Sequence, residues 1–411
     1  MINLAGTCRQ LKNGKWELAV SLGTDLKGKR IRKYKYVEAS GKREAEKLLA
    51  EFVAECTRGD YSEGERMLLK DYAQLWLKDY AEKQLKKKTV SRYKTLMERI
   101  LEALGNKRLC DLKPTHLIQF YNMLQEDGIR KDKVKVKENG EEKFIQKSGG
   151  LSPKTIRHHH ALLSAMLQDA VEWGLLKENI CERVKPPKVP KAEKTVFTIE
   201  QARELIKALD KEELKYKVIV MLAIFTGFRR GEIMGLEWSD IDFEEGLIEI
   251  NRTSLYTAED GIYEDTTKTK SSQRAAYIPK EIVKLLKEYR VEWNSNKAKA
   301  KDKWHETNRL FVQWNGLPMH PDTISQWFPK FIRKHNLPYV TFHGLRHTHA
   351  SILLAMGMDI SSIADQLGHE SIEMLIKTYA HTVRRSSKEV PKYLSNALFS
   401  HQNSKNKNLA E

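Results

Sequence analysis

Four short segments in the second half of the chain place polar side chains among apolar neighbours. In the first segment Arg229 stands at the start of a helix, where a buried arginine needs an anionic partner. That partner is either a bound anion or Glu232, which lies three residues further along the same helix face. In the third segment His343 and Arg346 also have helical i, i+3 spacing. Taken singly, such residues are usually an internal ion pair and a packed histidine.

The two remaining segments contain a lysine pair and a tyrosine. Residues 266–279 form a polar turn with Lys268 and Lys270, and this turn leads into a strand. Further along, a glycine turn ends at His369, and Tyr379 follows ten residues later, near the end of an amphipathic helix. A lone lysine or tyrosine is weak evidence for chemistry. The order of all four segments is much more specific.

That order resembles the tyrosine recombinase (phage integrase) family, whose signature is Arg, Lys, His-x-x-Arg, His and Tyr. The chain contains T-G-x-R-x-x-E, K-T-x-x-S-x-R, H-G-L-R-H-T, and L-G-H followed by Y-x-H. The resemblance extends to the rest of the chain, whose basic start is similar to the arm-binding domain of integrases from conjugative transposons and phages of Gram-positive bacteria. It implies a catalytic set of six residues: Arg229, Lys268, His343, Arg346, His369 and Tyr379.

The resemblance also implies how a DNA strand is cut. A phosphodiester is anionic, so catalysis is mainly charge neutralisation and alignment. Arg229 and Arg346 would bind the two non-bridging oxygens as planar forks. Tyr379 would attack the phosphorus, giving a 3′-phosphotyrosine and a free 5′-hydroxyl. Because the covalent link conserves the phosphodiester energy, rejoining needs no ATP.

The remaining members of the set are expected to handle protons. Lys268 would protonate the departing 5′-oxygen, and Lys270 stays an alternative, although K-T-x-x-S-x-R fits only Lys268. His343 would help to remove the tyrosine proton, because the pKa of free tyrosine is about 10. His369 would bind the phosphate or hold the site together. With this set no metal and no nucleotide cofactor is expected, and Glu232 is interpreted as structural support for Arg229.

The composition is consistent with a polyanionic partner. The 411 residues include 72 basic and 55 acidic ones, which leaves a net charge of +17. The alternative is a basic surface without a partner. The four cysteines stand far apart and form no Cys/His cluster, which is typical of free thiols in a reducing cytoplasm. The sequence shows neither a signal peptide nor a long apolar run, so we expect a cytoplasmic protein without a membrane partner.

Residues 1–62 are predicted to form an arm-type DNA-binding domain, with a three-stranded sheet followed by a helix over 42–55. A hairpin turn is expected at Asn13-Gly14, with strands over 15–22 and 30–37. The third strand is crowded with basic residues, which favours a sheet that contacts DNA. The alternative is an edge strand protected by lysines. The candidate contacts are Lys27, Lys29, Arg30, Arg32, Lys33 and Lys35.

Residues 66–185 are predicted to form a helical core DNA-binding domain, with helices over 68–80, 89–104, 114–124 and 153–173. Between the last two, a hairpin around Asn139-Gly140 is expected. The run His158-His159-His160 suggests a metal site, but consecutive helix positions point in different directions, so a DNA-facing or surface cluster is favoured. The candidate DNA contacts are Lys86, Lys87, Lys88, Arg92, Lys154, Arg157 and His158.

A Pro- and Lys-rich linker, 186–195, separates these segments from a catalytic domain over 196–400, and 401–411 is a polar tail. An apolar stripe over 387–399 either packs on its own domain or, as the resemblance implies, docks on a neighbouring subunit of a tetramer. The expected fold is multidomain and mainly α with small β-sheets, ending in a mixed α+β catalytic domain of the tyrosine recombinase type.

We therefore expect a site-specific recombinase that inserts and excises a mobile element, acts on double-stranded DNA at core and arm-type sites, and works as a homotetramer. By family analogy alone, an excisionase and a host DNA-bending protein are candidate partners. Two alternatives stay open. A type IB topoisomerase uses a similar residue set, and a DNA-binding architectural protein could carry a decayed site.

Overall fold

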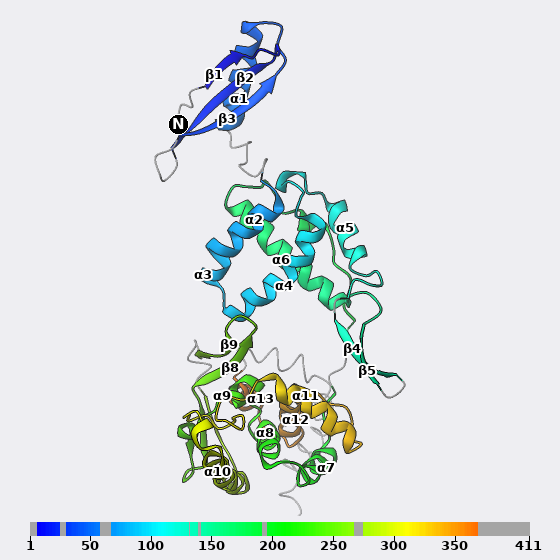
Figure 1. The fold of residues 1–411 in the computed structure, drawn as a ribbon, viewed down its shortest axis with the longest axis vertical. Helices are drawn as coiled ribbons and strands as arrows, with labels where there is room; N and C mark the ends of the chain where they lie inside the picture. The colour runs from blue at the N-terminus through cyan, green and yellow to red at the C-terminus, as the bar shows by residue number, and fades with distance from the viewer. Residues whose placement is uncertain are drawn as a thin grey trace, which may run out of the picture. The chain divides into compact units, whose positions relative to one another are not determined.

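The computed structural model describes residues 6–24, 30–57, 67–130, 132–138, 141–190, 195–266 and 274–368. It divides the chain into two compact units, 1–190 and 191–411 (Figure 1). The expected fold class, mainly helical with small antiparallel sheets, is confirmed. Among the described residues, no helix is both long and apolar enough to cross a membrane.

The chain begins with a three-stranded antiparallel sheet of order β1-β2-β3, formed by Gly6–Gln10, Trp16–Thr24 and Arg30–Val37. Helix α1, Lys42–Thr57, packs on this sheet. Leu18 and Val20 of β2 and Phe52 of α1 form the centre of a small core. The predicted turn at Asn13-Gly14 is present, and Gly14 adopts a φ of 79°, which glycine tolerates without strain.

The next part is helical and has a core of its own. Helices α2, α4 and α6 enclose that core. Ser152 caps α6: its hydroxyl accepts a hydrogen bond from the amide of Thr155, and Pro153 occupies the first helical position. The elements are α2 Leu69–Trp76, α3 Glu82–Gln84, α4 Lys87–Leu104, α5 Pro114–Met123 and α6 Pro153–Glu172.

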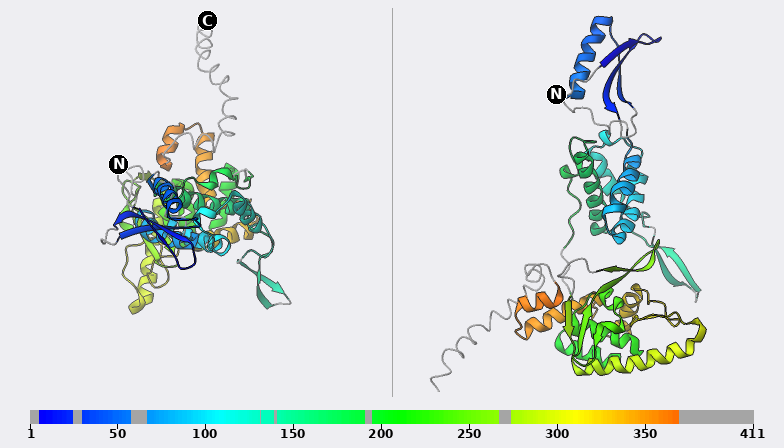
Figure 2. Two further views of the ribbon diagram at one scale, coloured as in Figure 1. Left: turned by 90° about the horizontal axis from the view of Figure 1, so that it is seen from above. Right: turned by 90° about the vertical axis from the view of Figure 1, so that its left-hand side faces the viewer.

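The first predicted helix of this part, 68–80, differs from the structure. It is α-helical only over Leu69–Trp76 and continues as a π-helical turn over Leu77–Ala81. The wider turn shifts the register of the buried stripe, so Ala81 is fully buried and Tyr80 only partly so. The predicted hairpin is present as β4 Lys133–Glu138 and β5 Glu141–Gln146, and it projects away from the helices (Figure 2).

The second unit is a mixed α+β structure. Its small antiparallel sheet has the order β10-β7-β6, from Arg274–Tyr277, Leu247–Ile250 and Ile241–Asp242, and a separate hairpin joins β8 Arg252–Thr257 to β9 Gly261–Thr266. The helices are α7 Ile199–Leu209, α8 Leu214–Thr226, α9 Arg230–Gly235, α10 Lys280–Ala300, α11 Asp322–Lys334, α12 Phe342–Ala355 and α13 Ile360–Leu367. Thr198 caps α7, because its hydroxyl accepts a hydrogen bond from the amide of Gln201.

Helix α8 lies at the centre of this unit, with α10 and α12 packed against it. Its residues 218–223 are all buried, which fits the unbroken apolar run in the sequence. Gly227 ends the helix in the left-handed region, with φ 65°. A Cβ at Gly227 would lie 2.5 Å from Leu367 and 2.8 Å from the ring of His349, so this turn packs directly on α12 and α13.

Candidate active site

Arg229 occupies the N-cap position of α9, immediately after the Gly227 turn. The predicted pair with Glu232 is present: Arg229 Nη1 lies 2.9 Å from Glu232 Oε1. The backbone amide of Arg229 also donates to Glu232 Oε2, at 2.6 Å. The Arg229 side chain is nevertheless 43% exposed. The apolar residues around it in the sequence had suggested a more buried position.

Glu232 has a second cationic partner that the sequence did not reveal. Arg274 on β10 places its Nη2 atom 2.5 Å from Glu232 Oε2, and both side chains are only 6% exposed. Burial by itself would raise the pKa of Glu232, but the charge of Arg274 and the contacts with Arg229 outweigh it and hold that pKa below its ordinary value. One buried carboxylate therefore stays ionised between two guanidinium groups.

Arg346 lies inside α12 and is 97% buried, since only 3% of its surface is exposed. Its Nη1 atom donates to the carbonyl oxygen of Gly227 at 2.7 Å, and its Nη2 atom donates to that of Leu367 at 2.5 Å. Arg229 Nη2 donates to the next carbonyl, Gly368 O, at 3.1 Å. Two consecutive carbonyl groups at the end of α13 thus bring the two guanidinium groups together.

His343 and Arg346 lie one turn apart on α12, as their spacing predicted. His343 is exposed and its ring packs edge-on against His347, at 5.1 Å between ring centroids. His349, further along α12, is buried and its Nδ1 atom lies 2.7 Å from the carbonyl oxygen of Ile224. Burial lowers the pKa of His349, so this imidazole is a neutral packing group beside the site.

Several predicted residues lie outside the described part of the chain: Lys268, Lys270, His369, Tyr379, the stripe over 387–399, Lys27 and Lys29. Their expected roles stay predictions. Described residues stand near two of them in the sequence: Gly368 immediately precedes His369, and β10 begins at Arg274, shortly after Lys268.

The candidate DNA contacts of the helical part lie at the starts of two helices, and His158 alone among them is partly buried. Lys86, Lys87, Lys88 and Arg92 are exposed at the start of α4, and Lys154 and Arg157 are exposed at the start of α6. Burial lowers the pKa of His158, and the nearby charges of Arg92 and Lys154 lower it further. The starts of the two helices are therefore neighbours, and helix N-termini favour anions.

The three consecutive histidines point in different directions. The Nδ1 atom of His159 lies 2.9 Å from the carbonyl oxygen of Thr155, and that of His160 lies 2.7 Å from the hydroxyl of Tyr121. His159 is fully buried. Within the described ranges no group of His, Cys, Asp and Glu has the arrangement of a metal site.

The basic residues of β3 divide between two faces of the sheet. Lys35 pairs across the strands with buried Leu18, forms a 3.0 Å ion pair with Glu55 of α1, and lies over the ring of Phe52. Lys35 therefore lies on the face of the sheet that α1 covers, and its charge is paired with that of Glu55. The sequence prediction counted it as a DNA contact, but strand alternation separates it from Arg32.

Alternation places Lys33 on the same face as Lys35, and Arg30 and Arg32 on the opposite face. Tyr34 and Tyr36 share that face, where the hydroxyl of Tyr36 donates to Glu17 at 3.1 Å. Arg30 and Arg32 are exposed. This arginine- and tyrosine-bearing face of the sheet is the one that α1 leaves uncovered.

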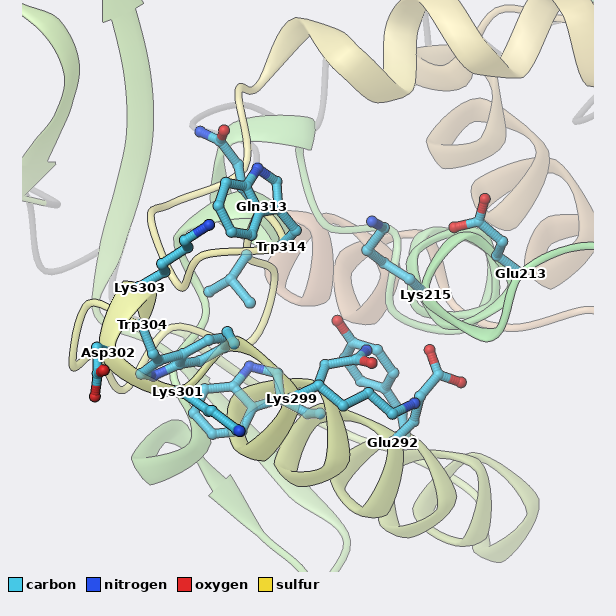
Figure 3. A pocket seen from close by; sticks show the side chains of 15 residues that line it. Glu213, Lys215, Glu292, Lys299, Lys301, Asp302, Lys303, Trp304, Gln313 and Trp314 are labelled. Atoms are coloured by element: carbon cyan, nitrogen blue, oxygen red, sulfur yellow. The ribbon is translucent and has the colours of Figure 1, made fainter.

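A cavity of about 660 Å³ lies elsewhere in the second unit, at the C-terminal end of α10 (Figure 3). Trp304 and Trp314 form part of its wall, and Lys299 and Lys303 lie at its edge. It includes none of the predicted site residues. The predicted catalytic residues that the structure describes therefore lie outside this cavity.

Arg274 is the site residue that sequence reasoning missed. It ends the K-T-x-x-S-x-R motif, but its partner Glu232 is 42 residues away in the sequence. A signal was present, since Arg274 is the charged residue that opens an otherwise apolar strand, R-A-A-Y. An arginine that opens a short apolar strand is a candidate for burial, and a buried arginine requires an anionic partner on another element.

Comparison with known proteins is consistent with this geometry. Residues 195–385 match the phage integrase family model, and residues 68–125 match the model of the phage integrase N-terminal SAM-like domain. A tyrosine recombinase XerC-like protein of Caldanaerobacter subterraneus subsp. tengcongensis is 26% identical over 96% of this chain and 98% of its own length. The ICEBs1 integrase of Bacillus subtilis is 30% identical over 61% of this chain and 67% of its own length.

Solved structures share the fold. The Tn1549 transposon integrase, in complex with a circular intermediate DNA, has a TM-score of 0.59 and 23% identity, and the match covers 79% of this chain and 99% of the integrase chain. The matched family models and the identity to the ICEBs1 integrase show that the chain is a member of the phage integrase family of tyrosine recombinases.

Proposed function

We propose that this protein is a site-specific DNA recombinase that cuts and rejoins DNA through a bond to Tyr379. The observation that carries the proposal is the convergence of Arg229 and Arg346 on the consecutive carbonyls of Leu367 and Gly368. Two planar cations brought together from different elements suit the two non-bridging oxygens of a phosphodiester.

The proposed reaction is two phosphoryl transfers. The Tyr379 oxygen attacks the phosphorus, the 5′-oxygen leaves with a proton from Lys268, and His343 helps to take the tyrosine proton. A 5′-hydroxyl then attacks the phosphotyrosine, which restores the phosphodiester and frees the tyrosine. Arg229 and Arg346 stabilise the charge on the pentacoordinate phosphorus in both steps. His369 binds the phosphate or holds the site together.

The biological role that we propose is integration and excision of a mobile element. Relatives of this chain are named as the ICEBs1 integrase, the transposase from transposon Tn916 of Enterococcus faecalis, and the integrase of Staphylococcus phage L54a. Solved relatives are described as bound to DNA, and one as a tetramer on a Holliday junction. We propose a DNA-bound homotetramer for this chain also, with the stripe over 387–399 docking between subunits.

Two surfaces are proposed to bind DNA. The first is formed by the neighbouring N-terminal ends of α4 and α6, where Arg92 and Lys154 lie near His158. It would bind the phosphates beside the crossover. The uncovered face of the N-terminal sheet, with Arg30 and Arg32, would bind an arm-type site. We propose three domains: an arm-type DNA-binding domain over 1–62, a core DNA-binding domain over 66–185 and a catalytic domain over 196–400. An excisionase and a host DNA-bending protein remain candidate partners by analogy.

Trapping on a suicide substrate tests the function. The substrate is a duplex nicked near a candidate crossover, so that the short 5′-hydroxyl fragment diffuses away after cleavage. Wild type and Tyr379→Phe are compared on a denaturing gel, with and without EDTA. We expect a protease-sensitive, DNA-shifted band only with Tyr379, and the same band with EDTA. If the variant forms as much covalent product as wild type, the assignment of Tyr379 is wrong.

A second test separates binding from catalysis. Arg229→Ala should still shift DNA in a native gel, because the proposed binding surfaces remain, but it should abolish cleavage. Equal loss of both activities would assign Arg229 to binding. Relaxation of supercoiled plasmid without a paired site would instead favour the topoisomerase alternative.

Deletion of residues 1–62 tests the two-site arrangement. The sheet and α1 have a core of their own, so we expect the truncated chain to cleave a core site and to lose binding to a distal arm-type site. Loss of core cleavage on this truncation would contradict the separate arm.

A further inference from the structure

Arg274 contacts every segment that fixes Arg229. Its Nη2 atom pairs with Glu232 of α9 at 2.5 Å, and its guanidinium lies over the ring of Phe228 at 5.6 Å. A Cβ at Gly368 would lie 2.6 Å from Arg274 Nη1, so the arginine packs directly against the end of α13. One buried side chain of β10 thus touches the start of α9, the turn before it, and the backbone that precedes His369.

The two arginines share the negative charge of Glu232. Glu232 is 95% buried, and its two oxygens are divided between the arginines: Oε1 accepts from Arg229 Nη1, and Oε2 accepts from Arg274 Nη2 and from the Arg229 amide. If Arg274 were absent, Oε2 would keep the Arg229 amide as a donor, and the Arg229 guanidinium would be the one remaining cation of this cluster to balance the carboxylate charge. Arg274 therefore limits how strongly Glu232 can draw the Arg229 guanidinium away from Gly368.

We propose that Arg274 is a positioning residue for strand cleavage, which through Glu232 sets the orientation of the Arg229 guanidinium beside the scissile phosphate. The inference rests on the proposed function and deepens it. Arg274 itself does not touch DNA in this role, because its side chain is only 6% exposed.

A purely structural role would make a different prediction. Removing a buried arginine destabilises the unit whether or not it positions Arg229. The discriminating property is the ionisation of Glu232. Among the described residues, the charged groups that act on Glu232 are Arg274 from β10 and Arg229 at the start of α9, and the Coulombic effect of Arg274 is the larger. Without Arg274, burial raises the pKa of Glu232, so a positioning role predicts that cleavage is lost at a higher pH than in wild type.

The experiment measures single-turnover cleavage of the suicide substrate by the full chain, from acidic to neutral pH. At neutral pH we expect Arg274→Met and Glu232→Gln each to slow cleavage about 100-fold, the effect of a misplaced catalytic group. The double variant should be slowed by about the same factor and not by the product of the two, because both changes break one unit. Arg274→Lys should recover part of the rate, since it restores a positive charge beside Glu232.

The pH profile supplies the second readout. The acid limb should move to higher pH in Arg274→Met and return in Arg274→Lys, and the double variant, which has no carboxylate at 232, should lack this shift. Arg309→Met is the matched control: Arg309 is equally buried and pairs with Glu264 at 2.6 Å, so its loss should lower Tm without moving the acid limb.

The outcomes are distinct. If wild type cleaves and the acid limb of Arg274→Met stays in place, or if the two single effects multiply in the double variant, the positioning role is wrong and the proposed function stands. If wild type forms no covalent product with any core substrate, the proposed function fails, and the positioning role fails with it. A shifted limb that Arg274→Lys restores supports the proposal.

Discussion

Arg229 and Arg346 donate to neighbouring carbonyls at the end of α13, yet the chain holds them by different means. Arg229 stands at a helix start, is 43% exposed, and is fixed by a carboxylate. Arg346 lies inside a helix, is 3% exposed, and donates to the carbonyls of Gly227 and Leu367. The first arrangement depends on charge, and the second on two backbone turns.

This difference has a physical consequence. A carboxylate titrates and a carbonyl does not, so acid should remove the acceptor charge that holds Arg229 but leave the acceptors of Arg346 unchanged. Conversely, a carbonyl is placed only by its backbone, so the Arg346 region should respond to changes at the glycine that ends α8.

Arg346→Ala should destabilise the second unit by about 4 kcal/mol, because it leaves two buried carbonyls without these donors and creates a cavity. Urea unfolding measures the loss. Arg229→Ala, whose side chain is partly solvated, is the comparison and should cost clearly less. Equal costs would contradict the different environments assigned to the two arginines.

Glu232→Gln should cost about 3 kcal/mol near neutral pH, because it leaves two cations around an uncharged amide. The pKa of Glu232 is below its ordinary value in the folded chain, so its stabilising contribution is present above the unfolded pKa and is lost as pH falls through the folded one. The difference in Tm between wild type and variant should therefore shrink on acidification. A difference that is constant with pH would show that the charge of Glu232 is not what matters.

Gly227→Ala should cost about 2 kcal/mol, from its left-handed φ of 65° and from the close approach of Leu367 and His349. Unlike Glu232→Gln, this loss should not vary across acidic pH. Gly174→Ala, at φ 73° with open space around the Cβ, isolates the backbone contribution in another part of the chain. If both substitutions cost the same, the packing of Gly227 on α12 and α13 contributes nothing.

Arg230→Ala is expected to change least. Arg230 follows Arg229 directly and pairs with Asp322 at 2.5 Å, but its pair is partly exposed to solvent. Such pairs contribute under about 1 kcal/mol, and salt weakens them. Cleavage should fall less than tenfold. An effect as large as that of Arg229→Ala would mean that the contact between α9 and α11, and not Glu232, orients the site.

The predictable part of the site is the part encoded by local spacing. Arg229 with Glu232, and His343 with Arg346, are separated by one helical turn, and the structure places both pairs as their spacing predicted. The glycine that ends α8 and the cap at Thr198 depend on equally local signals, because each acts within a few residues.

The features that could not be predicted depend on contacts between residues that are distant in the sequence. Arg274 meets Glu232 across 42 residues, and Arg346 meets Gly227 across 119. On β3 the density of charge predicted one basic surface, but strand alternation turns Lys35 toward Glu55 of α1. The π-helical turn at Leu77–Ala81 also depends on packing, since its residues carry an ordinary helical pattern.

Identifying the amino acid that becomes joined to DNA tests the central claim most directly. The trapped complex would be digested with nuclease and trypsin, and the nucleotide-bearing peptide sequenced by mass spectrometry. We expect a 3′-phosphate nucleotide on the peptide 378–384, attached to Tyr379. A nucleotide on any other residue, or one attached through a 5′-phosphate, would contradict the proposed mechanism.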